Sequence, residues 1–301
     1  MIDIAVIVVN WNAREDLRHC LQSLSTAPLP SVEFAVWVVD NASTDGSAEM
    51  VASEFPQVKL RVNTDNLGFS KANNQAIAEA LAETDTRSVF LLNSDAAVHP
   101  SALDALVAWA DANPGAGIVG PKVLNPDGTL QLSCRRFPSL GAGFFRNTYL
   151  GSLFPHNKFA KDYLMQEFDH AQTIPVDWVS GCAMLLRRDL IDSIGALDER
   201  FYMYCEDVDI CQRAWAAGRE VVYFPEAVVT HAIGRSSDKN ADTMIVEFHR
   251  SWYEFDRKRH PNSPLLRRAA VYAGLWLRAA IRIFNRRRAL RRTAPRSNSS
   301  H

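Results

Sequence analysis

Two apolar stretches of this 301-residue chain are followed by carboxylates. Asp40 follows Phe34–Val39, and Asp95 follows Val89–Leu92 after a short polar break that begins at Asn93. Uninterrupted apolar runs of this length predict strands buried on both faces, and ligands of open α/β sheets bind at the carboxyl ends of the strands. We therefore expect both carboxylates at one ligand-binding edge. For Asp95 the alternative is a helix N-cap, a position that Asp favours.

Amide side chains extend this edge, because Asn10 and Asn12 follow a third apolar run, Ile4–Val9. Carboxylates and amides suit a nucleoside, since Asp accepts hydrogen bonds from a base N–H or a ribose hydroxyl. We assign Asp40 to the base and Asp95 to the ribose and a metal. No G-x-G-x-x-G follows the first run and no Walker A sequence is present, which disfavours the dinucleotide fold and the P-loop. A diphosphate without a Gly-rich cradle is then expected to need a hard divalent cation, Mg²⁺ or Mn²⁺, on oxygen ligands.

Three further carboxylates lie within four residues, at Glu206, Asp207 and Asp209, where a helix through Ala217 is predicted to begin. Acidic residues in a first helical turn also interact favourably with the helix dipole, which explains one or two of them. Neighbouring aromatic side chains can desolvate a carboxylate and raise its pKa toward the range of a general base. These aromatic residues are Phe201, Tyr202 and Tyr204.

A histidine, His231, ends the apolar run Val228–Thr230. A lone histidine is more often structural than a ligand. Here the run predicts a strand that returns to the same sheet edge, so we interpret His231 as a metal ligand.

Strands that alternate with helices predict βαβ units and a largely parallel sheet. The small residues Ser180–Ala183 leave room for a close approach within the strand region Val176–Leu186. From about Cys134 to Thr173 the periodicity dissolves, and we interpret this basic, aromatic-rich stretch, with Arg135 and Arg136, as the acceptor side or a surface excursion. The other predicted strands are Val58–Val62, Ile118–Gly120, Lys122–Leu124 and Glu220–Phe224. Helices are predicted over Leu17–Leu24 and over Ser101–Asn113. Two more are predicted, one after the polar loop at 40–47 that ends at about Phe55, and one after the turn at 66–69 that ends at about Ala82.

Seven segments in this order resemble the family 2 inverting glycosyltransferases with the GT-A fold. They are VVNWN at 8–12, VVDNASTDGS at 38–47, NLGFSKANN at 66–74, LLNSDAAV at 91–98, GCAMLLRR at 181–188, YCEDVDICQR at 204–213, and His231. The resemblance implies a mixed, mostly parallel nucleotide-binding sheet flanked by helices. It is nearest to the rhamnosyltransferase-like branch.

The resemblance also implies roles for individual residues. Asp207 would be the catalytic base with Glu206 beside it, and Asp95 and His231 would hold the metal. The family's D-x-D motif is N-x-D here, with Asn93 in first position, and an amide oxygen is a weaker ligand than a carboxylate. The donor-binding residues would be Asn10, Asn12, Asp40, Asn66, Gly68, Asn93, Asp95 and Arg213.

The implied reaction is a single inverting displacement that moves L-rhamnose from dTDP-rhamnose to a glycan or polyprenyl-diphosphate-linked saccharide of the cell envelope. A UDP-sugar donor (galactofuranose or N-acetylglucosamine) and a catalytically inactive GT-A binding scaffold are the alternatives. The intact Glu206–Asp207 pair argues against the scaffold.

The end of the chain differs in charge from the rest. After Asp256 there are 13 Lys and Arg and no acidic residue, which leaves 20 basic against 34 acidic side chains before it. A basic amphipathic helix over Leu265–Arg292, too short in its uncharged run to span a bilayer, is typical of an interfacial anchor on anionic lipid. Packing on the catalytic domain and a homodimer contact are the alternatives, and the acidic body argues against nucleic acid.

This pattern predicts a GT-A catalytic domain at 1–260, with a nucleotide-binding half (1–98) and an acceptor half (99–260), and a helical tail at 261–301 with a disordered end from Arg291. No basic segment precedes Ile4, so we expect no signal peptide. Five scattered cysteines without C-x-x-C spacing fit reduced thiols. We therefore expect a cytoplasmic protein, peripheral on the inner face of the cell membrane.

Overall fold

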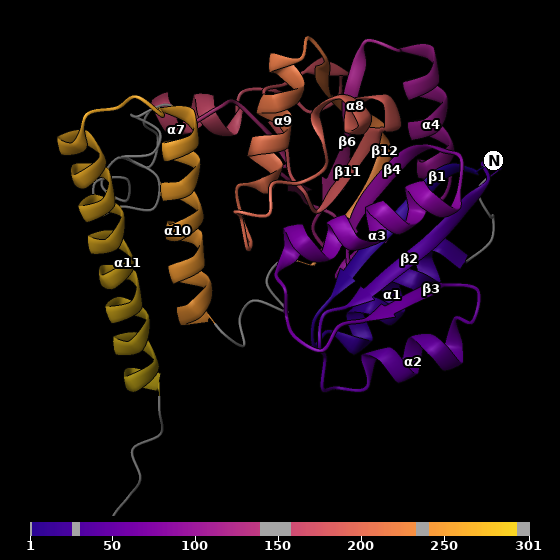
Figure 1. Ribbon diagram of the computed structural model, residues 1–301, viewed down its shortest axis with the longest axis horizontal. Coiled ribbons are helices and arrows are strands. Elements are labelled where there is room, and N and C mark those ends of the chain that lie inside the picture. The colour runs from indigo at the N-terminus through magenta and orange to yellow at the C-terminus, as the bar shows by residue number, and fades with distance from the viewer. Residues whose placement is uncertain (1, 26–30, 139–157, 233–240, 294–301) are drawn as a thin grey trace, which may run out of the picture. The chain divides into compact units, whose positions relative to one another are not determined.

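The computed structural model describes residues 2–25, 31–138, 158–232 and 241–293 (Figure 1). Its contacts divide the chain into two compact units, Met1–Ser236 and Ser237–His301. This division falls before the predicted domain boundary at 260/261, because helix α10 (Ala241–Arg259) groups with the second unit. The assignment of halves within the catalytic domain stays a prediction.

A mixed, mostly parallel sheet forms the centre of the first unit, in the order β3-β2-β1-β4-β11-β6-β12-β5. The first four strands in this order are mutually parallel, and β11 runs antiparallel between β4 and β6. Short strands β7 and β9 pair with β6 and β12, and β8 pairs with β10 in a separate two-stranded sheet. The bounds are β1 Ile2–Asn10, β2 Phe34–Asp40, β3 Lys59–Val62, β4 Thr86–Asn93, β5 Ala96–Val98, β6 Ala116–Leu124, β7 Leu130–Gln131, β8 Cys134–Arg135, β9 Ile174–Pro175, β10 Trp178–Val179, β11 Ala183–Arg187 and β12 Glu220–His231.

Helices cover both faces of this sheet (Figure 1). The four residues predicted to form the buried stripe of the first helix, at 17, 20, 21 and 24, are its four buried residues. The helices of this unit are α1 Arg14–Ser25, α2 Ser47–Glu54, α3 Phe69–Glu83, α4 Ala102–Ala112, α7 Lys158–Leu164, α8 Arg188–Ile194 and α9 Glu206–Ala216.

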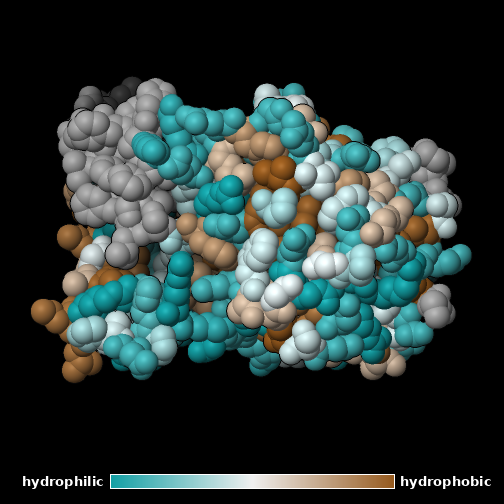
Figure 2. Space-filling view, turned by 90° about the horizontal axis from the view of Figure 1, so that it is seen from above, coloured by the Kyte–Doolittle hydropathy of each residue, from teal (hydrophilic) through white to brown (hydrophobic). Residues whose placement is uncertain are grey.

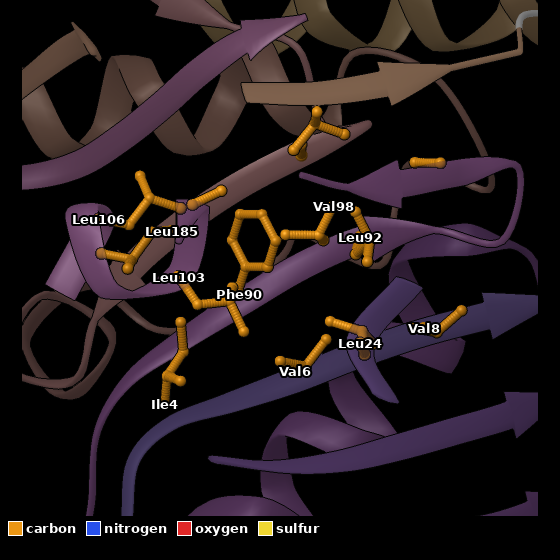
Figure 3. Packing of buried hydrophobic residues seen from close by; sticks show 14 of the residues in the cluster. Ile4, Val6, Val8, Leu24, Phe90, Leu92, Val98, Leu103, Leu106 and Leu185 are labelled. Atoms are coloured by element: carbon orange, nitrogen blue, oxygen red, sulfur yellow. The ribbon is translucent and has the colours of Figure 1, made fainter. Parts of the chain in front are cut away.

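The hydrophobic core lies between the sheet and the helices α1 and α4 (Figure 3). Alternate residues of β1 (Ile4, Val6 and Val8) point into this cluster together with Phe90 and Leu92 of β4. The residues between them are also fully buried, which explains why β1 reads as one apolar run without alternation. Because the apolar residues of β1 are packed on both faces, its polar last residue, Asn10, has a defined position at the edge of the sheet.

Three predicted elements differ from the structure. The strands expected at Ile118–Gly120 and Lys122–Leu124 form one strand, β6, and the two runs around Pro225 form the single strand β12. Pro121 and Pro225 suggested breaks, but β12 passes its proline with a bulge, one of the places where a strand accepts proline. The short strand β5 was not predicted, and it follows Asp95 directly. Helix α4 begins seven residues after Asp95, with Ser101 at its N-cap position, so the N-cap interpretation of Asp95 is wrong.

The second unit contains α10 and the predicted amphipathic helix, α11 (Leu265–Thr293). Asp242 of α10 pairs with Arg286 and Arg287 of α11, and the Tyr253 ring contacts that of Tyr272. None of the described helices is long and apolar enough to cross a membrane. Helix α11 continues to Thr293, so the first three residues of the end predicted as disordered from Arg291 are helical. The rest of that end, from 294 onward, and residues 139–157 of the predicted acceptor segment lie outside the described residues.

Candidate active site

The predicted nucleoside end of the site lies where β1 and β2 end side by side. The parallel register places Asn10 opposite Asp40. Asn10 Nδ2 donates a hydrogen bond to Asp40 Oδ2 at 3.1 Å, and the Ser43 N–H donates to Asp40 Oδ1 at 2.9 Å. Both side chains are buried, and Asn10 Oδ1 has no hydrogen-bond partner among the described residues. A buried oxygen without a hydrogen-bond donor, next to a carboxylate fixed by hydrogen bonds, is a feature of a ligand site.

Asn12 shapes the loop that follows Asp40. Its Oδ1 accepts the Thr44 N–H at 2.8 Å, and its own N–H donates to Ser43 Oγ at 2.9 Å. The backbone of Asn12 has a φ of 51°, a left-handed conformation that Asn tolerates better than most residues. Asn12 therefore orders the loop around Asp40 through hydrogen bonds within the protein.

Asn66 and Gly68 belong to a turn held from two sides. Asn66 Oδ1 accepts bonds from Asn41 Nδ2 at 2.8 Å and from the Gly68 N–H at 3.0 Å. On the other side, the Phe69 N–H donates to the Tyr202 carbonyl at 2.6 Å. Asn41 was not among the predicted residues. The sequence signal was its place directly after Asp40, within the segment VVDNASTDGS at 38–47 that carries part of the resemblance.

Asp95 and His231 meet because β5 pairs with β12. The antiparallel register places His231 opposite Ala96, and the Ala232 N–H donates to the Asp95 carbonyl at 2.9 Å. His231 Nε2 lies 3.2 Å from Asp95 Oδ1 and 3.3 Å from Asn93 Nδ2. The structure thus brings together the three residues that the sequence predicted for the metal end of the site.

Gln131 orients this histidine. His231 Nδ1 lies 2.8 Å from Gln131 Oε1, and Gln131 Nε2 donates to the His231 carbonyl at 3.2 Å. Because the amide oxygen can only accept, Nδ1 carries the proton, which leaves the Nε2 lone pair facing Asp95 when the ring is neutral. An orienting hydrogen bond to the second ring nitrogen is characteristic of metal-binding histidines.

The separation of Asp95 and His231 fits two neighbouring ligands of one divalent cation. Two ligands at adjacent corners of an octahedron about 2.1 Å from Mg²⁺ are about 3 Å apart, close to the observed separation. Among the described side chains, no group of three His, Cys, Asp or Glu residues gathers as a metal site. The remaining ligands would come from substrate phosphate and water, as is common for Mg²⁺.

The surroundings of His231 favour a positive charge next to Asp95. Burial of the His231 ring opposes its protonation, but hydrogen bonds to Asp95 and to the Cys182 thiol outweigh burial and raise the pKa of His231 to about 10. A positive charge at this place, whether a proton or a cation, is therefore favourable beside Asp95.

Asp207 is the second residue of helix α9, and two backbone N–H groups hold its carboxylate. The Gly181 N–H donates to Oδ2 at 3.1 Å, and the Val208 N–H donates to Oδ1 at 2.8 Å. Burial raises the pKa of Asp207, and these two N–H groups act against that rise. A carboxylate that stays ionised and poorly hydrated is a competent general base.

Glu206, the preceding residue, lacks the hydrogen bonds that hold the Asp207 carboxylate. Its Oε2 is buried and has no hydrogen-bond partner in the described part of the chain. Burial, followed by the neighbouring charge of Asp207, raises the pKa of Glu206 well above its ordinary value. The pair therefore keeps one proton on Glu206 and the charge on Asp207.

The turn at residues 180–182 connects the two ends of the site. Gly181 contacts Asp207, while the Cys182 carbonyl accepts the Asn93 N–H at 2.9 Å. A Cβ on Gly181 would lie 3.3 Å from the Asp207 Cβ, so the predicted close approach at these small residues is confirmed. One turn thus places the predicted base next to the predicted metal end.

Arg213 is engaged elsewhere in the structure. Its Nε donates to Asp209 Oδ2 at 2.8 Å, and its terminal nitrogens donate to the carbonyls of residues 194–196. Asp209 is almost completely buried. This hydrogen bonding ties α9 to the segment after α8, and it supports a structural role for Arg213 and not contact with a donor.

The sequence of this chain matches the family model described as glycosyltransferase like family 2 over residues 3–248. That match covers every residue of the site just described. The chain belongs to glycosyltransferase family 2.

Curated relatives agree with this assignment. The chain is 34% identical over 263 residues to an N-acetylglucosaminyl-diphospho-decaprenol L-rhamnosyltransferase of Mycobacterium tuberculosis, across 85% of this chain and 84% of the relative. It is 26% identical over 231 residues to the low-salt glycan biosynthesis hexosyltransferase Agl10 of Haloferax volcanii, across 77% of this chain and 66% of the relative.

The fold of this family 2 glycosyltransferase is shared with solved structures. The mannosyltransferase PcManGT of Pyrobaculum calidifontis, solved with GDP-Man and Mn²⁺, superposes with a TM-score of 0.56 at 18% identity. The match covers 93% of this chain and 75% of that structure. The predicted GT-A architecture, a mostly parallel sheet between helices, is therefore confirmed.

Proposed function

We propose that this glycosyltransferase moves L-rhamnose from dTDP-rhamnose to a polyprenyl-diphosphate-linked saccharide in cell-envelope polysaccharide synthesis, with inversion at the anomeric carbon. The observation that carries the proposal is the turn at residues 180–182, which lies against Asp207 on one side and Asn93 on the other. The name of the mycobacterial relative, which includes both L-rhamnose and a decaprenol-linked acceptor, supports the choice of sugar and acceptor.

On the donor side, the nucleoside would lie at the ends of β1 and β2. Asp40 would accept from the base N–H, and the unused Oδ1 of Asn10 offers a second acceptor. The turn with Asn66 and Gly68, fixed by Asn41, would close this end. We do not include Arg213, whose hydrogen bonds lie within the protein.

The metal end would hold the donor diphosphate. Asp95 and His231, with Gln131 fixing the histidine, would bind Mg²⁺ or Mn²⁺, and Asn93 could supply its amide oxygen after rotation of the amide plane. A cation bound there would act as a Lewis acid on the leaving diphosphate.

On the acceptor side, Asp207 would take the proton of the attacking hydroxyl. Its ionised form is favoured over that of Glu206 because two N–H groups bind it. The hydroxyl oxygen then attacks the anomeric carbon as the nucleoside diphosphate leaves from the opposite face. This single displacement needs no covalent sugar–enzyme intermediate.

An acceptor carried on a polyprenyl chain would place the enzyme at a membrane. We propose that α11 provides the contact on the inner face of the cell membrane, since it combines exposed apolar side chains with a run of arginines.

The test is donor turnover by the purified full chain with a lipid-linked acceptor, with and without Mg²⁺ or Mn²⁺. The donors are dTDP-rhamnose and several UDP-sugars, and Asp207→Asn is compared with the wild type. We expect metal-dependent transfer from dTDP-rhamnose and a loss of about 10²- to 10⁴-fold in the variant, which is the contribution typical of a general base. Nucleotide binding measured by calorimetry should persist in the variant, because the proposed nucleoside site lies at the ends of β1 and β2 and does not include Asp207.

Other outcomes would change the proposal in specific ways. Turnover of a UDP-sugar alone would keep the reaction and replace the donor. Nucleotide binding without turnover of any donor would favour a binding scaffold. Unchanged turnover by Asp207→Asn would remove it as the base.

A further inference from the structure

Arg135 lies one strand away from the turn that holds Asp207. Strand β8 pairs antiparallel with β10, with Arg135 opposite Trp178. The pairing continues beyond these strands, since the Ser180 N–H donates to the Ser133 carbonyl at 2.8 Å. The next residue after Ser180 is Gly181, which contacts Asp207. Arg135 is thus connected to the predicted base through two adjacent backbone segments.

The guanidinium of Arg135 is held in place by neutral groups. Its central carbon lies 4.9 Å from the centroid of the Trp178 ring and 6.0 Å from that of Tyr163. Nε and Nη2 both donate to the Leu132 carbonyl, at 3.3 and 3.1 Å. Aromatic faces and a carbonyl fix a cation without neutralising it.

No carboxylate in the described part of the chain forms an ion pair with Arg135, and its Nη1 has no hydrogen-bond partner there. The neighbouring Arg136 differs, because it is exposed and pairs with Asp177 at 3.4 Å. The charge of Arg135 also acts on the site, since it lowers the pKa of Asp207 against the larger effect of burial. A fixed, half-buried and unneutralised arginine beside an active site is suited to an anionic ligand.

A second group, on the residue directly before strand β8, lacks a partner. The hydroxyl of Ser133 is buried and has no hydrogen-bond partner among the described residues. Residues two apart on an extended segment point to the same side, so Ser133 and Arg135 face the same way. An arginine fork and a hydroxyl together can donate to phosphate oxygens.

We propose that Arg135 binds the phosphate next to the sugar of a diphosphate-linked acceptor, and so positions the acceptor hydroxyl at Asp207. This inference rests on the proposed function. The donor diphosphate is assigned to the Asp95–His231 end, so the anion that accompanies the acceptor is the one that arrives beside the base. In a sugar diphosphate, that phosphate is only the width of one ring away from the reacting hydroxyl.

The test compares two acceptors that differ only in charge. One is N-acetylglucosamine on farnesyl diphosphate, and the other is the farnesyl glycoside of the same sugar without the diphosphate. The variants are Arg135→Ala, Arg135→Lys and, as the matched neighbour, Arg136→Ala. Steady-state transfer gives kcat and KM for each acceptor, and calorimetry gives the affinity for each acceptor and for the nucleotide.

We expect Arg135→Ala to weaken binding of the diphosphate acceptor and raise its KM by about 10- to 100-fold, the range for loss of a charge-assisted contact. The neutral glycoside should change by less than about threefold under the same reasoning. Arg135→Lys should recover part of the loss because it keeps the charge without the fork. Arg136→Ala should resemble the wild type with both acceptors.

Equal losses with both acceptors would overturn the proposal, because they would mean that Arg135 acts only on Asp207 or on folding. Reduced nucleotide affinity would assign Arg135 to the donor diphosphate instead. The calorimetric comparison does not depend on turnover. A wild type that transfers no sugar but binds the diphosphate acceptor through Arg135 would therefore reject the proposed function and keep only the contact between Arg135 and the acceptor phosphate.

Discussion

At the scale of single residues, Glu206 and Asp207 are neighbours with opposite surroundings. Asp207 accepts two backbone N–H bonds, whereas Glu206 Oε2 is buried without a partner among the described residues. Burial and the charge of Asp207 raise the pKa of Glu206, so it stays protonated in the folded chain where the unfolded chain has lost the proton. Unfolding then releases a proton. This contribution to stability is therefore greatest below the ordinary pKa of 4.5 and falls as the pH rises toward the raised pKa.

Glu206→Gln should remove this dependence, because glutamine is an uncharged replacement of nearly the same shape. We expect the melting temperature of the variant to exceed that of the wild type by at least about 2 °C at pH 8, on the scale of a change of about 1 kcal/mol in a chain of this size. The two proteins should converge near pH 4.5. Scanning calorimetry across this pH range measures the difference. A constant difference at every pH would contradict the assignment of the proton to Glu206.

Patterns in the sequence identified the proposed site residues more readily than the residues that hold them in place. Asp95 and His231 each follow an apolar run, Asp95 after a short polar break, and the structure brings Asp95 Oδ1 within 3.2 Å of His231 Nε2. Gln131 was missed because its role comes from a contact with a residue 100 positions away, and no local pattern marks it. Arg213 was assigned to the donor from the resemblance, whereas its place on α9 directs it to Asp209 and the carbonyls after α8.

At the scale of elements, the turn before α3 and the segment before α9 depend on each other at Gly68. Gly68 has a φ of 82° and a ψ of 176°, a region almost restricted to glycine. A Cβ there would also overlap the Tyr202 carbonyl oxygen and lie 2.6 Å from a ring carbon of Tyr202. Tyr202 lies in the segment that leads to Asp207, so the fit of Gly68 helps to place the proposed base.

Gly68→Ala should therefore be compared with Gly195→Ala. Gly195 has nearly the same backbone conformation, with a φ of 78° and a ψ of 169°, but no atom would lie within 4 Å of an added Cβ. Both changes should cost about 1–3 kcal/mol of unfolding free energy from backbone strain. Only Gly68→Ala should also reduce kcat, because it displaces the segment before α9. Denaturant titration and transfer rates on both variants separate the two effects, and equal rates would mean that this contact does not position Asp207.

The strands show why element boundaries were less predictable than element types. The apolar runs of β1, β2 and β4 were found because both of their faces are buried. Strands β6 and β12 each unite two predicted runs that are separated by a proline. The local sequence predicts a break at each proline, but the two strands stay continuous because they pair with each other. The three-residue strand β5 carries no periodic signal and exists because β12 provides its hydrogen bonds.

At the scale of the whole molecule, the uneven charge of the chain has a structural counterpart on α11. Arg286 and Arg287 pair with Asp242 of α10, so part of the basic charge serves the helix pair itself. The exposed apolar side chains recur at helical spacing, and they include Leu266, Leu277, Ile281 and Phe284, which are between 51% and 83% exposed. Figure 2 shows apolar side chains projecting at the left edge, where α11 lies in Figure 1. We call Leu266, Leu277, Ile281 and Phe284 the α11 stripe.

The α11 stripe should insert into the interface of an anionic membrane, because exposed apolar groups beside arginines gain both burial and charge attraction there. We expect the wild type to sediment with vesicles containing phosphatidylglycerol, and Leu277→Glu with Phe284→Glu to reduce the partition coefficient by about tenfold or more, from the lost burial of two large side chains. Asn285→Glu on the same helix adds a negative charge without removing an apolar group, so it should have a smaller effect. Equal losses from both changes would mean that charge alone determines binding. Retention of binding by the double variant, together with concentration-dependent association of the wild type in the absence of lipid, would assign the stripe to contact between copies of this chain.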